Sequence, residues 1–172
     1  MILTSSLIML KVSFNEICKQ NITFEEDGTF YSFFFDDNSF EKGELHWTTS
    51  YQYGTLNILY FVRKENFFYL FTSTPEHAKI FKKVLLNLNP EWEVEVLKVP
   101  RNSKIPEFKD SRVENLIYDK NFGFSMKITF DAKWKSTVKF YSNGIITYKM
   151  NNDLKYILGI CDICESLVDS ME

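Results

Sequence analysis

The chain has 172 residues, of which 45% are hydrophobic and 25% are charged, with a net charge of −3 at neutral pH. This composition excludes a disordered chain, and a charge of this size does not by itself identify a partner. No apolar run reaches the roughly 20 residues that cross a bilayer, and the apolar start lacks the basic region and cleavage site of a signal peptide. We therefore expect a cytoplasmic protein with no membrane contact.

Residues 7–19 form the first segment with a clear pattern. Their apolar residues recur at helical spacing, which predicts a helix. The denser run of Ile8, Met9 and Val12 leaves a strand open for the first half of the segment.

A β meander is predicted next. Apolar and polar residues alternate in short runs, and Asp27-Gly28 and Gly54 mark turns between them. The expected strands cover residues 22–24, 29–35, 45–49, 55–63 and 67–73.

The apolar period then changes to that of a helix. Thr74 and Pro75 suit the start of a helix, and Asn89-Pro90 suits its end. Trp92 and the two valines that follow it alternate with glutamates, which predicts a half-exposed strand.

Residues 98–112 contain two prolines and several basic residues without an apolar period. They predict a long loop that joins two sub-halves, residues 1–97 and 113–172, of a single domain covering residues 1–172.

The second sub-half repeats the pattern of strands followed by a helix. Strands are expected over residues 124–130, 137–142 and 145–150, with Asn143-Gly144 as a hairpin turn. Asn151 or Asn152 is expected to cap a long C-terminal helix. The whole pattern predicts an α+β fold in which antiparallel meanders carry helices packed mainly on one face.

Sites for catalysis or metal binding have little support in the sequence. Cys161 and Cys164 have redox-motif spacing, but they lie inside a predicted helix and are explained more simply as core residues. A zinc site would need Cys18 and a histidine besides this pair, and zinc sites usually show two close ligand pairs. The histidines, His46 and His77, have no recognisable catalytic partner, and His46 is expected to face opposite Trp47.

The acidic groups at residues 25–27 and 36–37 fall at predicted turns, where Asp is favoured for its backbone hydrogen bonds. We expect no cofactor, no metal and no catalytic residues, and the sequence favours a non-catalytic protein while leaving an enzyme open.

Aromatic residues carry the main functional hypothesis. They make up 17% of the chain, and several predicted strands have bulky rings at successive positions, hence on both faces. Rings on both faces of a strand must be covered on both sides, and a partner protein or a second copy of the chain could cover one of them. We expect a protein-binding module such as an immunity protein, adaptor, chaperone or complex subunit. The contact candidates are Phe33, Phe35, Tyr51, Tyr53, Phe67 and Tyr69.

A nucleic-acid-binding accessory protein is the first alternative. Residues 125–150 have five lysines and one acidic residue, whereas residues 15–46 have eight acidic and two basic residues. The predicted strands place a polar, lysine-bearing set on one face and an apolar set on the other. The contact candidates are Arg101, Lys127, Lys139, Tyr141 and Lys149.

A small-molecule carrier or an enzyme, with a pocket between the sheet and a helix, is the remaining alternative. It would require a ring-lined cavity with a few convergent polar groups.

Overall fold

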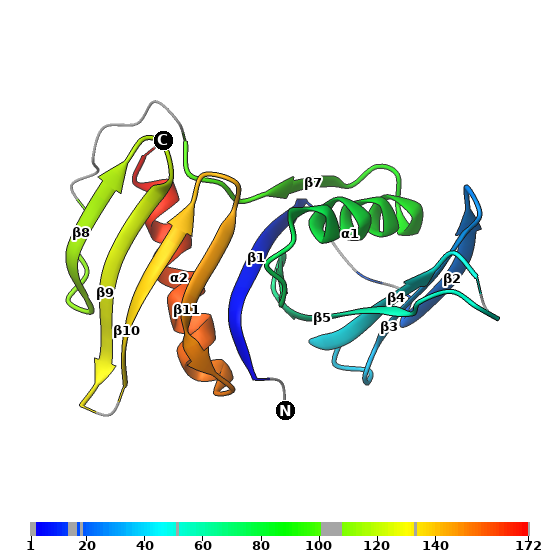
Figure 1. The fold of residues 1–172 in the computed structure, drawn as a ribbon, viewed down its shortest axis with the longest axis horizontal. Coiled ribbons are helices and arrows are strands. Elements are labelled where there is room, and N and C mark those ends of the chain that lie inside the picture. The colour runs from blue at the N-terminus through cyan, green and yellow to red at the C-terminus, as the bar shows by residue number, and fades with distance from the viewer. Residues whose placement is uncertain are drawn as a thin grey trace. The chain divides into compact units, whose positions relative to one another are not determined.

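The computed structural model describes residues 3–13, 17, 19–50, 52–100, 108–132 and 134–171. These residues form eleven strands and two helices, one of which is C-terminal (Figure 1). The predicted sheet-dominated fold with helices is confirmed at this level. The expectation that both helices pack mainly on one face stays a prediction.

The chain divides into two compact units. We call Leu10–Val96 the central unit, and Met1–Met9 together with Leu97–Glu172 the terminal unit. Residues 1–9, which the sequence analysis grouped with the first sub-half, therefore belong with the C-terminal part of the chain. The described parts of the predicted loop, residues 98–100 and 108–112, contain no helix or strand, and residues 101–107 lie outside the described residues.

The central unit is an antiparallel sheet with one helix. Its strand order is β2-β3-β4-β5-β6-β1, and β7 pairs with the second half of β1. The elements are the second half of β1 (Thr4–Ser13), β2 (Asn21–Glu26), β3 (Thr29–Phe35), β4 (Lys42–Thr48), β5 (Asn57–Lys64), β6 (Phe67–Leu70), α1 (Pro75–Leu88) and β7 (Glu93–Val96).

Strand β1 replaces the helix predicted over residues 7–19, and that prediction is wrong for residues 7–13. The first half of β1 pairs with β11 in the terminal unit, and the second half pairs with β7. Every residue from position 7 to position 10 is fully buried, so both faces of the strand are covered. A strand covered on both faces needs a continuous apolar run, which resembles the dense stripe of a helix in sequence.

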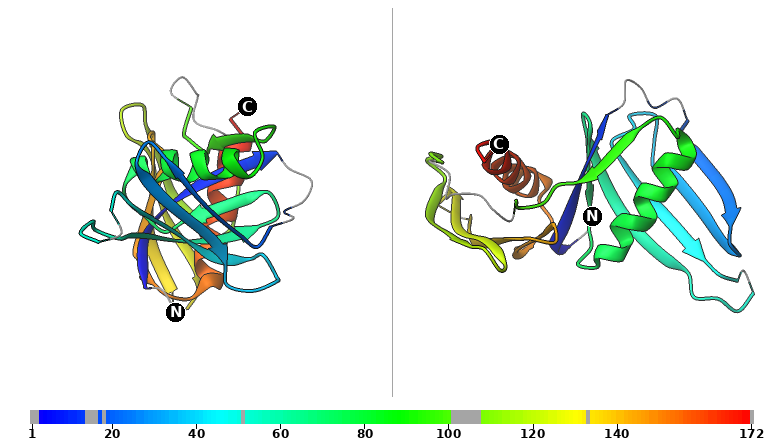
Figure 2. Two further views of the ribbon diagram at one scale, coloured as in Figure 1. Left: turned by 90° about the vertical axis from the view of Figure 1, so that its right-hand side faces the viewer. Right: turned by 90° about the horizontal axis from the view of Figure 1, so that it is seen from above.

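A cluster of phenylalanine rings forms the core between α1 and the central sheet. The Phe81 ring of α1 has its centroid 5.0 Å from that of Phe61 and 5.3 Å from that of Phe68. Phe33 stacks on Phe61 with 5.1 Å between centroids. These rings are at most 1% exposed. Helix α1 therefore covers one face of this sheet, as the right-hand view of Figure 2 shows.

The strands of the terminal unit are antiparallel, with the order β1-β11-β10-β9-β8. Their apolar face is buried, and α2 packs there with buried Ile157, Ile160 and Leu167. Asp153 caps α2, where its side chain accepts a 2.9 Å hydrogen bond from the Lys155 amide. Neither Asn151 nor Asn152 holds the expected capping position. The elements are β8 (Val113–Asp119), β9 (Gly123–Asp131), β10 (Trp134–Tyr141), β11 (Ile145–Asn151) and α2 (Leu154–Asp169).

Strand β8 was not predicted from the sequence. Its pairing with β9 shifts register between Glu114 and Ile117, and Asn115 has a φ of 52°. A bulge of this kind changes which residues point to each face, so the strand lacks the regular alternation by which strands are recognised.

Gly159 lies where α2 approaches the ring of Phe130. A Cβ atom at this position would lie 2.6 Å from both Cε1 and Cζ of that ring. Alanine improves helix propensity by about 1 kcal/mol, whereas crowding a packed core costs about 1–3 kcal/mol. We expect Gly159→Ala to lower the free energy of unfolding by about 1 kcal/mol in urea denaturation.

The partner ring provides the control for this prediction. Phe130→Leu removes the flat ring edge, so the double variant should lose less stability than the sum of the two single losses. If the stability loss of the double variant equals the sum of the two single losses, the contact between Gly159 and Phe130 is contradicted.

Candidate functional site

Four of the predicted protein-contact residues lie in the core. Phe33, Phe35, Phe67 and Tyr69 are 0%, 2%, 5% and 1% exposed, so their rings offer no surface to a partner. Phe33 and Phe35 point toward α1, where Phe33 meets Phe61 and Phe81. Phe67 and Tyr69 alternate with Phe68, which meets Phe81, so they point to the other side of β6 and are buried there. Tyr53, in the turn before β5, is 92% exposed. Tyr51 lies outside the described residues.

The opposite face of the same strands carries a second set of rings. The register pairs Phe34 of β3 with Glu44 of β4, and Glu44 in turn with Tyr60 of β5. The neighbouring row joins Ser32, His46 and Ile58. We call this surface the aromatic face. It consists of Phe30, Ser32, Phe34, Glu44, His46, Ile58 and Tyr60, on the side of β3–β5 that α1 does not cover.

The aromatic face combines exposed apolar groups with one polar pair. Ile58 is 43% exposed and Tyr60 is 37% exposed, although both lie within strand β5. Between them and Phe34, the ring N–H at Nε2 of His46 donates a 2.6 Å hydrogen bond to Oε2 of Glu44. The Phe34 ring meets the His46 ring edge-on, with 5.2 Å between centroids. The pair is thus held within the apolar surface and partly screened from water.

The sequence did contain a signal for this face. In the run 30–35 the two alternating sets are both aromatic, but only one of them includes a serine, Ser32. In β4 the positions in register with that set are polar, Glu44 and His46, while the alternate positions are Leu45 and Trp47. Reading both strands together would have placed Phe30 and Phe34 outside and Phe33 inside.

The two histidines have different surroundings. His46 faces opposite the buried Trp47, as the alternation predicted. His77 is half-buried at the start of α1, where its Nδ1 lies 2.8 Å from Oγ1 of Thr72 and its ring meets Trp47 edge-on. Burial lowers the pKa of His77, and the nearby carboxylate of Glu76 partly opposes this shift. These contacts join the helix start to the sheet.

Cys161 and Cys164 are fully buried on α2 and form no disulfide with each other. Burial raises the pKa of the Cys164 thiol, which is opposite to what a redox-active thiolate needs. Cys18 lies outside the described residues. Within the part of the chain that the structure describes, no three His, Cys, Asp or Glu side chains are grouped to hold a metal ion.

The acidic groups at the turns have local partners. Asp27, with a φ of 51°, stands in the β2–β3 turn, and Asp37 accepts a 2.8 Å hydrogen bond from the Ser39 amide. Glu26 forms a 2.6 Å ion pair with Lys83 of α1. These groups therefore serve the turn and the edge of the sheet.

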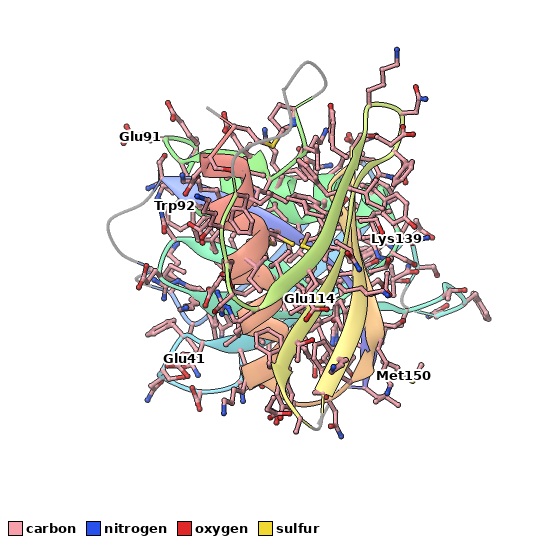
Figure 3. All side chains as sticks on the ribbon, turned by 90° about the vertical axis from the view of Figure 1, so that its left-hand side faces the viewer. Glu41, Glu91, Trp92, Glu114, Lys139 and Met150 are labelled. Carbon is pink, nitrogen blue, oxygen red and sulfur yellow. The ribbon has the colours of Figure 1, made fainter. Side chains whose placement is uncertain are left out.

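The terminal sheet has the two faces that the sequence predicted. Met126, Val138 and Ile146 are buried, whereas Lys127, Lys139 and Lys149 are exposed and Tyr141 is partly exposed. Figure 3 shows Lys139 on the side of the sheet away from α2. Arg101, the remaining nucleic-acid candidate, lies outside the described residues. We call the exposed surface of β9–β11 the lysine face. It comprises Ser125, Lys127, Thr129, Lys135, Thr137, Lys139, Tyr141, Thr147 and Lys149.

Two surface depressions accompany these features. One, of about 320 Å³, lies on the lysine face between Glu114, Lys127 and Lys135. The other, of about 390 Å³, lies beside Lys82 and Lys83 of α1 and Glu26. In the central unit, the rings around Phe81 fill the space between the sheet and α1. The ligand pocket that was one expectation lay beside the long C-terminal helix, and it stays a prediction.

Among the described residues, neither helix is long and apolar enough to cross a membrane. Comparison of the chain with protein-family models, with curated proteins and with solved structures finds no match.

Proposed function

We propose that this chain is a non-catalytic protein-binding module that contacts its partner through the aromatic face. The observation that carries this proposal is the exposure of Ile58 and Tyr60, 43% and 37%, in the middle of a sheet beside the partly exposed Phe34. Apolar side chains that are grouped on one surface are unfavourably exposed to water. Their burial by a partner lowers the free energy of the complex.

The polar groups of the aromatic face also suit a protein partner. Interfaces typically have aromatic anchors at the centre and hydrogen-bonded polar groups among them. Here Glu44 and His46 already satisfy one another through their 2.6 Å hydrogen bond, so covering them leaves fewer unpaired polar atoms. The partner expected from this chemistry is a protein with an apolar patch of its own, including a second copy of this chain.

The proposal also keeps the cytoplasmic location expected from the sequence. Its support is the small, odd number of cysteines, three, which fits a reducing compartment.

The test compares the wild-type chain with Ile58→Ser/Tyr60→Ser. Both side chains are substantially exposed, so the fold should tolerate the change. We expect the partner bound by the wild-type chain to be bound at least about tenfold more weakly by the double variant, because aromatic anchors carry most of an interface's energy. Affinity purification with quantitative mass spectrometry identifies the partner, calorimetry measures its affinity, and solution mass reports self-association.

Ile117→Ser is the matched control. Ile117 is 59% exposed on β8, in the terminal unit, so this variant loses an exposed isoleucine away from the aromatic face. It should bind the partner as the wild-type chain does. If the double variant binds the partner or dimerises as strongly as the wild-type chain, the aromatic face is not the binding site. If the wild-type chain stays monomeric and enriches no protein over the variant, the proposed protein-binding function is wrong.

A further inference from the structure

Four lysines surround one threonine on the lysine face. Lys135 and Lys139 precede and follow Thr137 by two residues on β10, so all three point to the same side. The register places Lys127 of β9 directly opposite Thr137. On the other side Lys139 pairs with Thr147, so the same register continued by two residues brings Lys149 opposite Thr137. The amide of Lys149 donates a 2.8 Å hydrogen bond to the side-chain Oγ of Ser136, next to Thr137, so Lys149 lies beside this part of β10.

Among the residues that the structure describes, no carboxylate forms an ion pair with these lysines. Within the described parts of the chain, none of Lys127, Lys135, Lys139 and Lys149 forms an ion pair, whereas Lys79 and Lys83 of α1 do. Glu114 is the cross-strand neighbour of Lys127 and lines the depression here. Like charges on neighbouring strands repel one another and destabilise a sheet. A bound anionic ligand would neutralise these charges and remove the repulsion.

The lysine face is longer than one phosphate group. Lys135 and Lys139 are four residues apart on one strand, which separates their Cα atoms by about 13 Å. Lys127 is diagonal to both, at the roughly 7–8 Å that separates such neighbours on adjacent strands. The hydroxyls of Thr129, Thr137 and Thr147 stand between the lysines and supply further hydrogen-bond donors. A chain of phosphates fits this arrangement better than a single anion does.

An aromatic ring continues the same row. Tyr141 follows Lys139 by two residues on β10, and its partner across the sheet is Gly123. Glycine has no side chain to cover the ring, and a Cβ at this position would collide with the Phe140 carbonyl oxygen. A partly exposed ring beside a track of lysines is the combination that holds single-stranded nucleic acid, with bases stacked on the ring and phosphates over the cations.

We propose that the lysine face of β9–β11 is a binding surface for single-stranded nucleic acid, centred on Thr137 with Tyr141 as its stacking residue. This surface belongs to the terminal unit, whereas the aromatic face belongs to the central unit. The proposal therefore stands or falls separately from the proposed protein-binding function.

Fluorescence anisotropy with labelled oligothymidylate and oligouridylate of twelve nucleotides tests the proposal on the full chain. We expect binding at low salt that weakens with a log–log salt slope of about −2 to −3, because four lysines each displace somewhat less than one counterion from a single strand. Lys127→Gln/Lys135→Gln/Lys139→Gln should weaken binding at least about tenfold and reduce that slope by about 2. Glu114→Gln should strengthen binding about two- to fivefold, because it removes a carboxylate that repels phosphate.

Two further variants separate this surface from general polyanion binding. Lys82→Gln removes an exposed lysine of α1 in the central unit and should leave the affinity unchanged. Tyr141→Ala should weaken oligothymidylate binding about fivefold or more while leaving heparin binding unchanged, because heparin has no bases to stack. No binding at low salt, equal affinities of wild type and the triple variant, or equal losses for both ligands in Tyr141→Ala would overturn the proposal.

Discussion

Phe61→Ala should lower the free energy of unfolding by about 3–5 kcal/mol, the largest loss we expect from a single truncation in the central unit. The Phe61 ring is 1% exposed. Its centroid lies 5.1 Å from Phe33, 5.4 Å from Phe35 and 5.0 Å from Phe81. Alanine removes the ring to which β3 and α1 are both packed, and the rigid neighbours cannot close the cavity. Urea denaturation followed by circular dichroism measures the change.

Phe61→Leu is the graded control for this result. Leucine keeps most of the buried volume, so its loss should be less than half that of alanine. Tyr53→Ala removes a ring that is 92% exposed and should change stability by less than about 0.5 kcal/mol. A loss below about 1 kcal/mol for Phe61→Ala would show that the ring cluster is not the core of this unit.

Local signals predicted much of the central unit because its turns and helix ends have residues that dictate backbone geometry. Asp27 and Gly28 adopt φ values of 51° and 73°, as the β2–β3 turn requires. Pro75 begins α1 and Asn89 caps its end. These residues act within a few positions of themselves, so their effect can be recognised without knowing the fold.

The failures came from features that depend on distant partners. Strand β1 pairs with β11 and β7, which lie far from it in the sequence, and its own apolar run resembles part of a helix. The bulge at Asn115 can be recognised only when the pairing of β8 with β9 is known. No local pattern contains that information.

The same distinction explains the candidate surfaces. Along β9–β11, apolar and polar residues mostly alternate, so the two faces of this sheet could be predicted. Lys135 of the lysine face lay outside the strand predicted over residues 137–142. Along β3 both alternating sets are aromatic, so alternation alone did not decide whether Phe33 or Phe34 pointed inward. Phe33 points inward because its ring packs on Phe81 of α1, which lies 48 positions away in the sequence. The exposed member of the pair is therefore the better functional candidate, and Phe34 takes the place of Phe33.

Gly43 links the core to the aromatic face, and its replacement is the second large effect we expect. A Cβ atom here would collide with the carbonyl oxygen of Phe34 and lie 2.6 Å from Cζ of Phe61. Alanine in a strand usually gains about 0.5–1 kcal/mol over glycine, because it restricts the unfolded chain. The clash reverses this sign, because one of the atoms in the way belongs to the backbone of the neighbouring strand and cannot rotate aside. We expect Gly43→Ala to lower the free energy of unfolding by about 2–3 kcal/mol in urea denaturation.

Gly28→Asn separates the clash from the general effect of replacing a glycine. Nothing lies within 4 Å of a Cβ atom at Gly28, and asparagine tolerates the φ of 73° found there. This variant should stay within about 0.5 kcal/mol of the wild-type stability. If Gly43→Ala proves equally neutral, β3 and β4 must be able to separate at this point. Because Phe34 lies on β3 beside Gly43, such freedom would let the aromatic face change shape on binding, whereas the predicted loss implies a face that is rigid before its partner arrives.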